Sequence, residues 1–375
     1  MEFTNRLILK EMRKQYLIYL LAAALVAIMP SCRKAPQYKA LIITGQSDHN
    51  WGVSSESLKQ ILDETDLFSS TIIATPSKGE DMSGFKPDFS KYDLVVLDYE
   101  GDAFSETTNA SLIDYVNNGG GLVAYNSESN PGAVVSDSVK ISERRSFEVR
   151  TAQIDHPVTK GLPVRWLHPD DVIVQGLKPA GEDTRVLATV SLDNSYFSTG
   201  RREPVLLARN FGKGRIFITM IGTPDDKENN ALHCAGFIVT LQRGAEWAVT
   251  GNVTQEAPFD FPTAAGAVLR PGFKSITYEE VFDNLGNYDI EKSTKYFTYL
   301  QSQIRNAAGN EKTLLKLEKK MVGILKNEEA SDDAKKLILR ELSWMGTDYC
   351  IPAIKALASD PELSDDVEFA LARLK

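Results

Sequence analysis

Cysteine and histidine are both scarce in this chain of 375 residues, which contains three of the first and four of the second. Three cysteines do not make a disulfide framework in a chain of this length. The histidines show neither an i, i+4 pair nor the Cys/His spacing of a zinc site, so we expect no metal and no cofactor. A single-metal site built from His49 and carboxylates at a sheet edge is the alternative.

Basic residues are fewer than acidic ones, and the motif of a serine nucleophile is absent. Lysine and arginine total 42 against 51 aspartates and glutamates, and the net charge of −9 argues against nucleic acid or an anionic lipid surface as a partner. The chain has no G-x-S-x-G elbow, which disfavours a serine hydrolase. It has no long low-complexity tract either, so we expect a globular protein after a short N-terminal segment.

That N-terminal segment resembles a bacterial lipoprotein signal. Four of the first fourteen residues are basic, and the apolar run Tyr16–Met29 that follows is shorter than the roughly 20 residues needed to cross a bilayer as a helix. Pro30-Ser31-Cys32 then resembles a lipoprotein processing site. We expect a signal peptide at 1–31, a lipid anchor on Cys32, a tether at 32–37, and a place in the bacterial cell envelope, facing the periplasm or on the outer membrane. A cleaved signal peptide with an incidental cysteine is the alternative.

The remaining chain divides into an α/β part and a helical part. Alternating strand and helix patterns over 38–254 predict a flavodoxin-like α/β domain with a mainly parallel sheet. Residues 255–275 contain three prolines and predict a linker, and apolar stripes at helical spacing over 276–375 predict an all-α, HEAT-like domain. Strands are expected at Lys39–Thr44, Thr71–Ala74, Asp93–Leu97, Gly121–Tyr125, Asp171–Gln175, Arg185–Ser191, Glu203–Asn210 and Gly214–Ile221, and helices at Ser54–Glu64, Ser105–Asn117 and Asn229–Trp247.

Polar side chains gather where the first predicted strand ends. Asp48, His49, Asn50 and Trp51 offer a carboxylate, an imidazole, an amide and an aromatic face at the edge of the sheet where ligands of open α/β folds bind. His49 suits acid/base catalysis, with Asp48 as a neighbouring carboxylate, and Trp51 suits stacking on a sugar ring. The alternative is that Asp48 or Asn50 caps the next helix and Trp51 plugs its base.

Two further groups are expected near this edge. Asn126 and Glu128 follow the strand Gly121–Tyr125, which makes Glu128 a second carboxylate for proton transfer and Asn126 a ligand contact. Asp171 and Glu203 lie at the ends of later strands and are expected to help with catalysis and substrate binding respectively. A solvated loop is the alternative for Asn126 and Glu128.

Five segments, in this order and spacing, resemble the trehalose-utilisation (ThuA-like) family, which has a class I glutamine amidotransferase-like fold. They are Ile42–Trp51, Leu58–Phe68, Tyr115–Val123, His156–Pro163 and Arg243–Thr254. The resemblance implies a role in carbohydrate use, with disaccharides such as trehalose and their 3-keto derivatives as ligands. It does not imply glutamine hydrolysis, because no cysteine follows the strand Gly121–Tyr125. The helical part resembles an extension found in envelope relatives.

The chain departs from the family at three places. Asn126 stands where relatives often have a histidine, Asp171-Val172 where they have Asp-Glu, and Gly222-Thr223-Pro224 where they have Gly-His-Asp. These departures leave two hypotheses. In the first, an enzyme moves a proton of a disaccharide or keto-sugar with His49 and either Glu128 or Asp171. In the second, a non-catalytic sugar-binding or scaffold lipoprotein docks a partner enzyme on its helical tail.

Overall fold

The computed structural model describes residues 36–127, 134–181, 183–192, 202–258, 260–289, 291 and 295–374. The expected signal peptide, Cys32 and Glu128 therefore lie outside the described residues, and the predictions made for them stay predictions. Across the part of the chain that is described, no helix is both long and apolar enough to span a membrane.

A nine-stranded sheet organises the first part of the chain, with the strand order β2-β1-β3-β4-β11-β10-β9-β6-β7. The first five strands are parallel, in the order typical of flavodoxin-like folds, and the other four continue the sheet with antiparallel pairing. The parallel strands are β1 (Tyr38–Thr44), β2 (Phe68–Ala74), β3 (Leu94–Asp98), β4 (Gly121–Tyr125) and β11 (Gly214–Thr219). The antiparallel strands are β6 (Arg145–Thr151), β7 (Arg165–Asp171), β9 (Thr184–Ser191) and β10 (Arg202–Phe211), and β5 (Val134–Ile141) and β8 (Val174–Pro179) form a separate ribbon.

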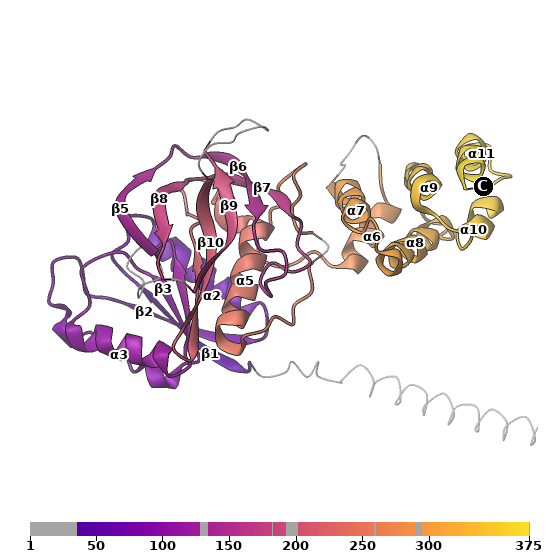
Figure 1. Ribbon diagram of the computed structural model, residues 1–375. Helices are drawn as coiled ribbons and strands as arrows, with labels where there is room; N and C mark the ends of the chain where they lie inside the picture. Colours follow the sequence, from indigo (N-terminus) through magenta and orange to yellow (C-terminus); the bar gives the residue numbers. More distant parts are fainter. Residues whose placement is uncertain are drawn as a thin grey trace, which may run out of the picture.

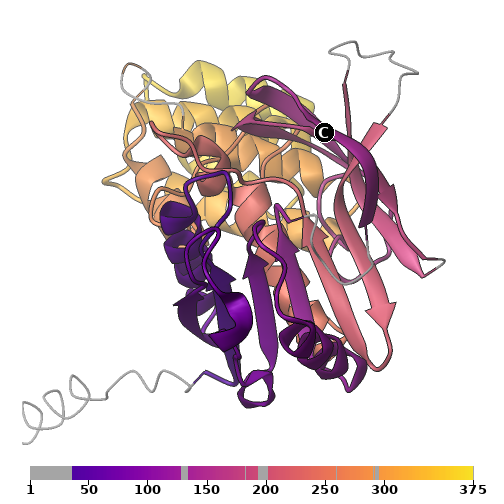
Figure 2. The ribbon, with the colours of Figure 1, turned by 90° about the vertical axis from the view of Figure 1, so that its left-hand side faces the viewer.

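Helices cover both faces of the sheet (Figures 1 and 2). Ile42 of β1 shares a core with α2 (Trp51–Asp63) and α5 (Ala235–Thr250). The next residue, Ile43, points to the other face, where its core includes α3 (Glu106–Asn117) and β8. Because both faces are covered, the central parallel strands β3 and β4 are buried throughout, as the sequence predicts, whereas the edge strand β2 is only partly buried. The carboxyl ends of β1, β3 and β11 carry the polar residues Thr44, Asp98 and Thr219, whose side chains are buried.

Two predicted elements are wrong in detail. The expected strand Asp171–Gln175 is split, because β7 ends at Asp171 and β8 begins at Val174. The expected helix Asn229–Trp247 is interrupted at Cys234, which has an extended backbone (φ −64°, ψ 122°) and forms a β-bridge with Leu269. Cys234 is nevertheless a buried free thiol in the core.

The helical part is an array of short helices that leads away from the sheet (Figure 1). Its helices are α6 (Tyr278–Gly286), α7 (Lys295–Asn306), α8 (Glu311–Leu325), α9 (Asp332–Met345), α10 (Ile351–Ala356) and α11 (Ser364–Arg373), after the short α4 (Asn230–His233) of the α/β part. The apolar stripes of α8 and α9 share one buried core. In the segment before the array, Arg270 Nε donates to Asp260 Oδ2 at 2.7 Å in a buried ion pair. The HEAT-like classification and the domain boundaries stay predictions.

Helix α5 packs so closely on the sheet that Gly244 has no room for a side chain. A Cβ added there would overlap the ring of Phe217, whereas a Cβ at Gly323 of α8 would meet nothing within 4 Å. We expect Gly244→Ala to lower the free energy of unfolding by about 1–3 kcal/mol through overpacking. The matched control Gly323→Ala should raise it by up to about 1 kcal/mol, because alanine is the better helix former. Calorimetric melting measures both, and equal transition temperatures for the two variants would contradict this account of the packing.

Candidate functional site

The central feature of the carboxyl edge is a hydrogen bond between His49 and Asp98. His49 lies in the loop after β1 and Asp98 is the last residue of the neighbouring β3, and the distance from His49 Nε2 to Asp98 Oδ1 is 2.7 Å. The Asp98 side chain is fully buried, while the His49 side chain is 11% exposed. The carboxylate that bonds to His49 is therefore that of Asp98. The sequence neighbour Asp48 lies exposed.

Two hydroxyl groups donate hydrogen bonds to the other oxygen of the Asp98 carboxyl group. Ser54 Oγ donates to Asp98 Oδ2 at 2.7 Å and Thr44 Oγ1 donates to the same oxygen at 3.2 Å, so the carboxyl group acts as an acceptor. Burial raises the pKa of Asp98, and the hydrogen bond and charge of His49 oppose that shift. A ring that donates from Nε2 to Asp98 presents its Nδ1 for proton transfer.

The other residues predicted around His49 occupy the start of α2. Asn50 caps this helix, since its side chain accepts a hydrogen bond from Val53 N at 3.4 Å. Trp51 is the first helical residue and is 38% exposed, so it does not plug the base of the helix. Its ring remains available to a ligand, and the roles predicted for Asp48, Asn50 and Trp51 in binding stay predictions.

Asn126 and the loop after β11 form the other side of the edge. Asn126 has a left-handed backbone (φ 44°), and its Nδ2 donates to Thr223 Oγ1 at 3.3 Å. Its Oδ1 is buried and has no hydrogen-bond partner among the described residues. Next to it, the Tyr125 hydroxyl donates to Gly222 O at 2.5 Å, and the Tyr125 ring meets His49 edge-on with centroids 5.8 Å apart. Burial raises the pKa of Tyr125 well above its ordinary value, so this hydroxyl stays protonated.

Asp171 and Glu203 lie deeper than their predicted roles imply. The Asp171 carboxylate is fully buried, with Oδ2 2.8 Å from His168 Nε2 and 2.6 Å from the amide of Gly222. Glu203 is also buried, and its Oε2 accepts a hydrogen bond from Gly176 N at 2.9 Å, which ties β10 to β8. Both carboxylates thus hold backbone segments, and a direct role of either in catalysis or binding stays a prediction.

Sequence reasoning missed two residues that build this edge. Asp98 directly follows an apolar strand, which is the same signal that identified His49, and could have been found from it. Arg144 donates to the carbonyl oxygens of Asp170 (2.6 Å), Thr223 (3.2 Å) and Pro224 (2.8 Å). It lies between two strands that the sequence pattern did not predict, so no local signal pointed to it.

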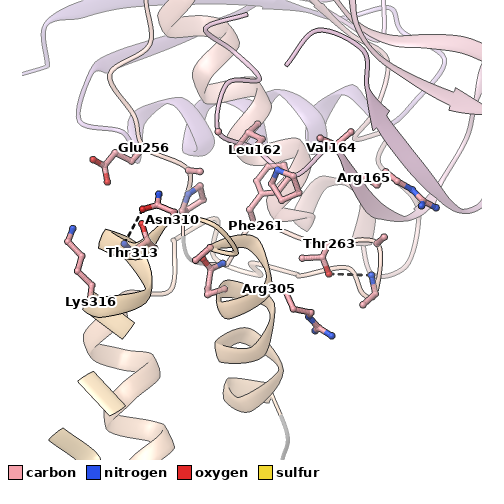
Figure 3. A pocket seen from close by; sticks show the side chains of 18 of the residues that line it. Leu162, Val164, Arg165, Glu256, Phe261, Thr263, Arg305, Asn310, Thr313 and Lys316 are labelled. Atoms are coloured by element: carbon pink, nitrogen blue, oxygen red, sulfur yellow. Dashed lines mark hydrogen bonds between the residues drawn. The ribbon is translucent and has the colours of Figure 1, made fainter. Parts of the chain in front are cut away.

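Two cavities lie away from His49. The larger, of about 1420 Å³, is bordered by the segment before β7, the segment between sheet and helices, and helices α6 to α8 (Figure 3). Phe261 and Leu162 are on one wall, and Arg305, Thr313 and Lys316 are on the other (Figure 3). The smaller, of about 500 Å³, surrounds Tyr115 near the amino ends of the strands. Among the described residues, no three His, Cys, Asp or Glu side chains are grouped to hold a metal ion.

A family model and a solved structure identify the family of this chain. The family model described as trehalose utilisation (ThuA) matches residues 39–248. The solved structure of a ThuA-like protein from Parabacteroides merdae is 36% identical, has a TM-score of 0.58, and is matched over 64% of this chain and 100% of its own. A ThuA-like protein from Bacteroides uniformis is 19% identical with a TM-score of 0.43, over 64% of this chain and 97% of its own. A curated relative from Aspergillus oryzae, a probable aspartic-type endopeptidase, is 25% identical over 46% of this chain, which spans only 36% of that relative's length.

Replacing the Asp98 carboxylate by an amide tests which nitrogen of His49 carries the proton. In the wild type we expect the neutral ring to have its proton on Nε2, which long-range ¹H–¹⁵N NMR spectra distinguish from Nδ1. In Asp98→Asn the amide can donate to Nε2, so we expect the Nδ1–H tautomer and a loss of about 1–3 kcal/mol of stability. An unchanged tautomer in Asp98→Asn would show that Asp98 does not orient the ring.

Proposed function

Because the chain belongs to the trehalose-utilisation (ThuA) family, we propose that it acts on a disaccharide or its 3-keto derivative by acid/base proton transfer. The observation that supports this most is the bond of 2.7 Å between His49 Nε2 and the buried Asp98. A histidine fixed by a buried carboxylate and still partly exposed has the arrangement of a general base.

The proposed reaction removes a hydrogen from the carbon beside a ketone. Such a hydrogen is acidic because its loss gives an enolate, and this chemistry favours a 3-keto-sugar over the parent disaccharide. His49 Nδ1 takes the proton, while Trp51 covers an apolar face of the sugar ring. Asn126 and Thr223 offer polar atoms to the sugar hydroxyls, and Glu128 is the second proton-transfer group.

The proposed place of the protein is the cell envelope. The basic and apolar N-terminal segment and Cys32 support a lipid anchor, and the acidic net charge of −9 supports a partner other than nucleic acid. A carbohydrate reaching the envelope is then the substrate.

Deuterium exchange tests the proposed reaction directly. The soluble chain that begins after Cys32 is mixed in D₂O with 3-keto-trehalose and with trehalose, and ¹H NMR follows each sugar proton. We expect loss of the signal beside the ketone, and an exchange rate about 10²–10⁴-fold lower in His49→Gln.

The matched control is His156→Gln, because His156 lies against Trp247 (ring centroids 4.9 Å apart) and away from His49 in the same domain. Full exchange in His49→Gln would refute the assignment of the base. Exchange lost equally in His156→Gln would show damage to the fold instead.

A sugar-binding or scaffold role is the second candidate, and the cavity of about 1420 Å³ favours it, because ligand sites often lie between domains (Figure 3). In this role a sugar broadens NMR lines without being turned over. The variant Arg305→Ala weakens sugar binding, whereas the control Lys312→Ala, at an exposed residue outside the cavity, does not.

The docking of a partner enzyme has support from an exposed aromatic side chain on the helical part. The side chain of Trp344 is 69% exposed, and Arg373 Cζ lies 3.7 Å from the centroid of its ring. The second candidate would be rejected if the wild type turned the sugar over and Arg305→Ala bound it as tightly as the wild type does.

A further inference from the structure

A second histidine–carboxylate pair lies behind the edge that carries His49. His168 Nε2 and Asp171 Oδ2 are 2.8 Å apart, and both side chains are fully buried. The His168 ring packs against Phe147 of β6 and Trp166 of β7, with centroids 5.3 and 5.8 Å away, and beside Cys234 between α4 and α5. No ligand can reach this pair directly, so a role in the reaction must be exerted through its neighbours.

Asp171 of this pair holds the loop Gly222–Pro224 through hydrogen bonds from the backbone amides of the loop. Asp171 Oδ2 accepts a hydrogen bond from Gly222 N at 2.6 Å and a longer one from Thr223 N at 3.4 Å. From the other side, Arg144 donates to the carbonyl oxygens of Thr223 and Pro224 at 3.2 and 2.8 Å. Arg144 Nη1 is also 3.9 Å from Asp171 Oδ1, which closes the network around the loop.

This loop is in turn what holds the residues beside His49. Gly222 O accepts the hydroxyl of Tyr125 at 2.5 Å, and Thr223 Oγ1 accepts Asn126 Nδ2 at 3.3 Å. The Tyr125 ring meets the His49 ring edge-on at 5.8 Å. Each link in this series is a direct contact, so a change at His168 is transmitted through packed groups to the site.

We propose that His168 is a positioning residue, which through Asp171 fixes the loop Gly222–Pro224 and thereby places Tyr125 and Asn126 beside His49. The inference rests on the proposed function for its effect on turnover, but the position of the loop is measurable without any substrate. It assigns a role to a histidine that our sequence analysis gave none.

The electrostatics support an ion pair at this place. Burial alone lowers the pKa of His168, but the neighbouring Cys234 and Asp171 side chains raise it to about 9. The other charged groups that face the pair are Arg144 and, 4.0 Å behind it, Asp225. A protonated His168 donates from Nε2 to Asp171 Oδ2, the oxygen that also accepts the amide of Gly222.

Hydrogen exchange of single amides is the first test. In His168→Leu we expect the amides of Gly222 and Thr223 to exchange at least tenfold faster, with no change in the strands β1 and β3. The matched control is Gln242→Leu, which removes a buried hydrogen bond of 2.9 Å to Ile61 O elsewhere in the domain. Unchanged protection at Gly222 in His168→Leu, or an equal loss of protection at Gly222 in Gln242→Leu, would overturn the proposal.

Turnover is the second test. Misplacing Tyr125 and Asn126 should lower the rate of deuterium exchange about tenfold or more in His168→Leu, mainly in kcat, because His49 itself is intact. His168→Gln keeps a donor toward Asp171 and should recover part of the loss. If the wild type itself shows no turnover, the proposed function fails, but the amide measurement still decides on the positioning role.

A titration of the wild type tests the same inference without a variant that must fold. Because the folded-state pKa of His168 lies above the ordinary 6.5, its stabilising contribution is complete below pH 6.5 and is lost as the pH rises through about 9. We expect the ¹³Cα signal of Gly222 to shift with the same midpoint as the His168 ring signals. A Gly222 signal that stays constant while His168 titrates would overturn the proposal.

Discussion

Burial of the Asp98 carboxylate is the constraint on which the carboxyl edge of the sheet depends. A carboxylate without contact with water needs donors for its oxygens, and here they come from the end of β1, the first turn of α2, and His49. Satisfying one buried group therefore fixes three segments relative to each other. His49 is oriented by the same bonds that make the burial of Asp98 tolerable, so the stability of the edge and the direction of the imidazole have a common cause.

The two histidine–carboxylate pairs show how burial separates roles. His49 is partly exposed, whereas His168 is enclosed by aromatic rings and faces no solvent. The first has the surroundings of a group that exchanges protons with a ligand, and the second has those of a group that holds backbone in place. Tyr125 lies between them and contacts one through its ring and the other through the loop at Gly222.

The parallel half of the sheet was predictable because its central strands are apolar runs, and β4 matches its predicted range of Gly121–Tyr125. The polar first half of the edge strand β2, which begins at Phe68, was missed. In the antiparallel half, β9 and β10 agree to within one residue at each end with the predicted strands Arg185–Ser191 and Glu203–Asn210. The strands β6 and β7 were not predicted, because they are only half buried and contain charged residues, and Pro169 breaks the strand pattern. At the site, His49 and Asn126 were predictable from their positions at strand ends. The pairing of His49 with Asp98 depends on the order of strands in space, which a local pattern does not contain.

The direction of β1 determines which side of the molecule the site occupies. The strand begins at Tyr38, directly after the predicted tether, and its 7 residues run about 23 Å before the loop with His49. Under the proposed lipid attachment at Cys32, the amino ends of the parallel strands are nearest to the bilayer and the carboxyl ends point away from it. A sugar would then approach from the open aqueous space, and the lipid surface would not obstruct its entry.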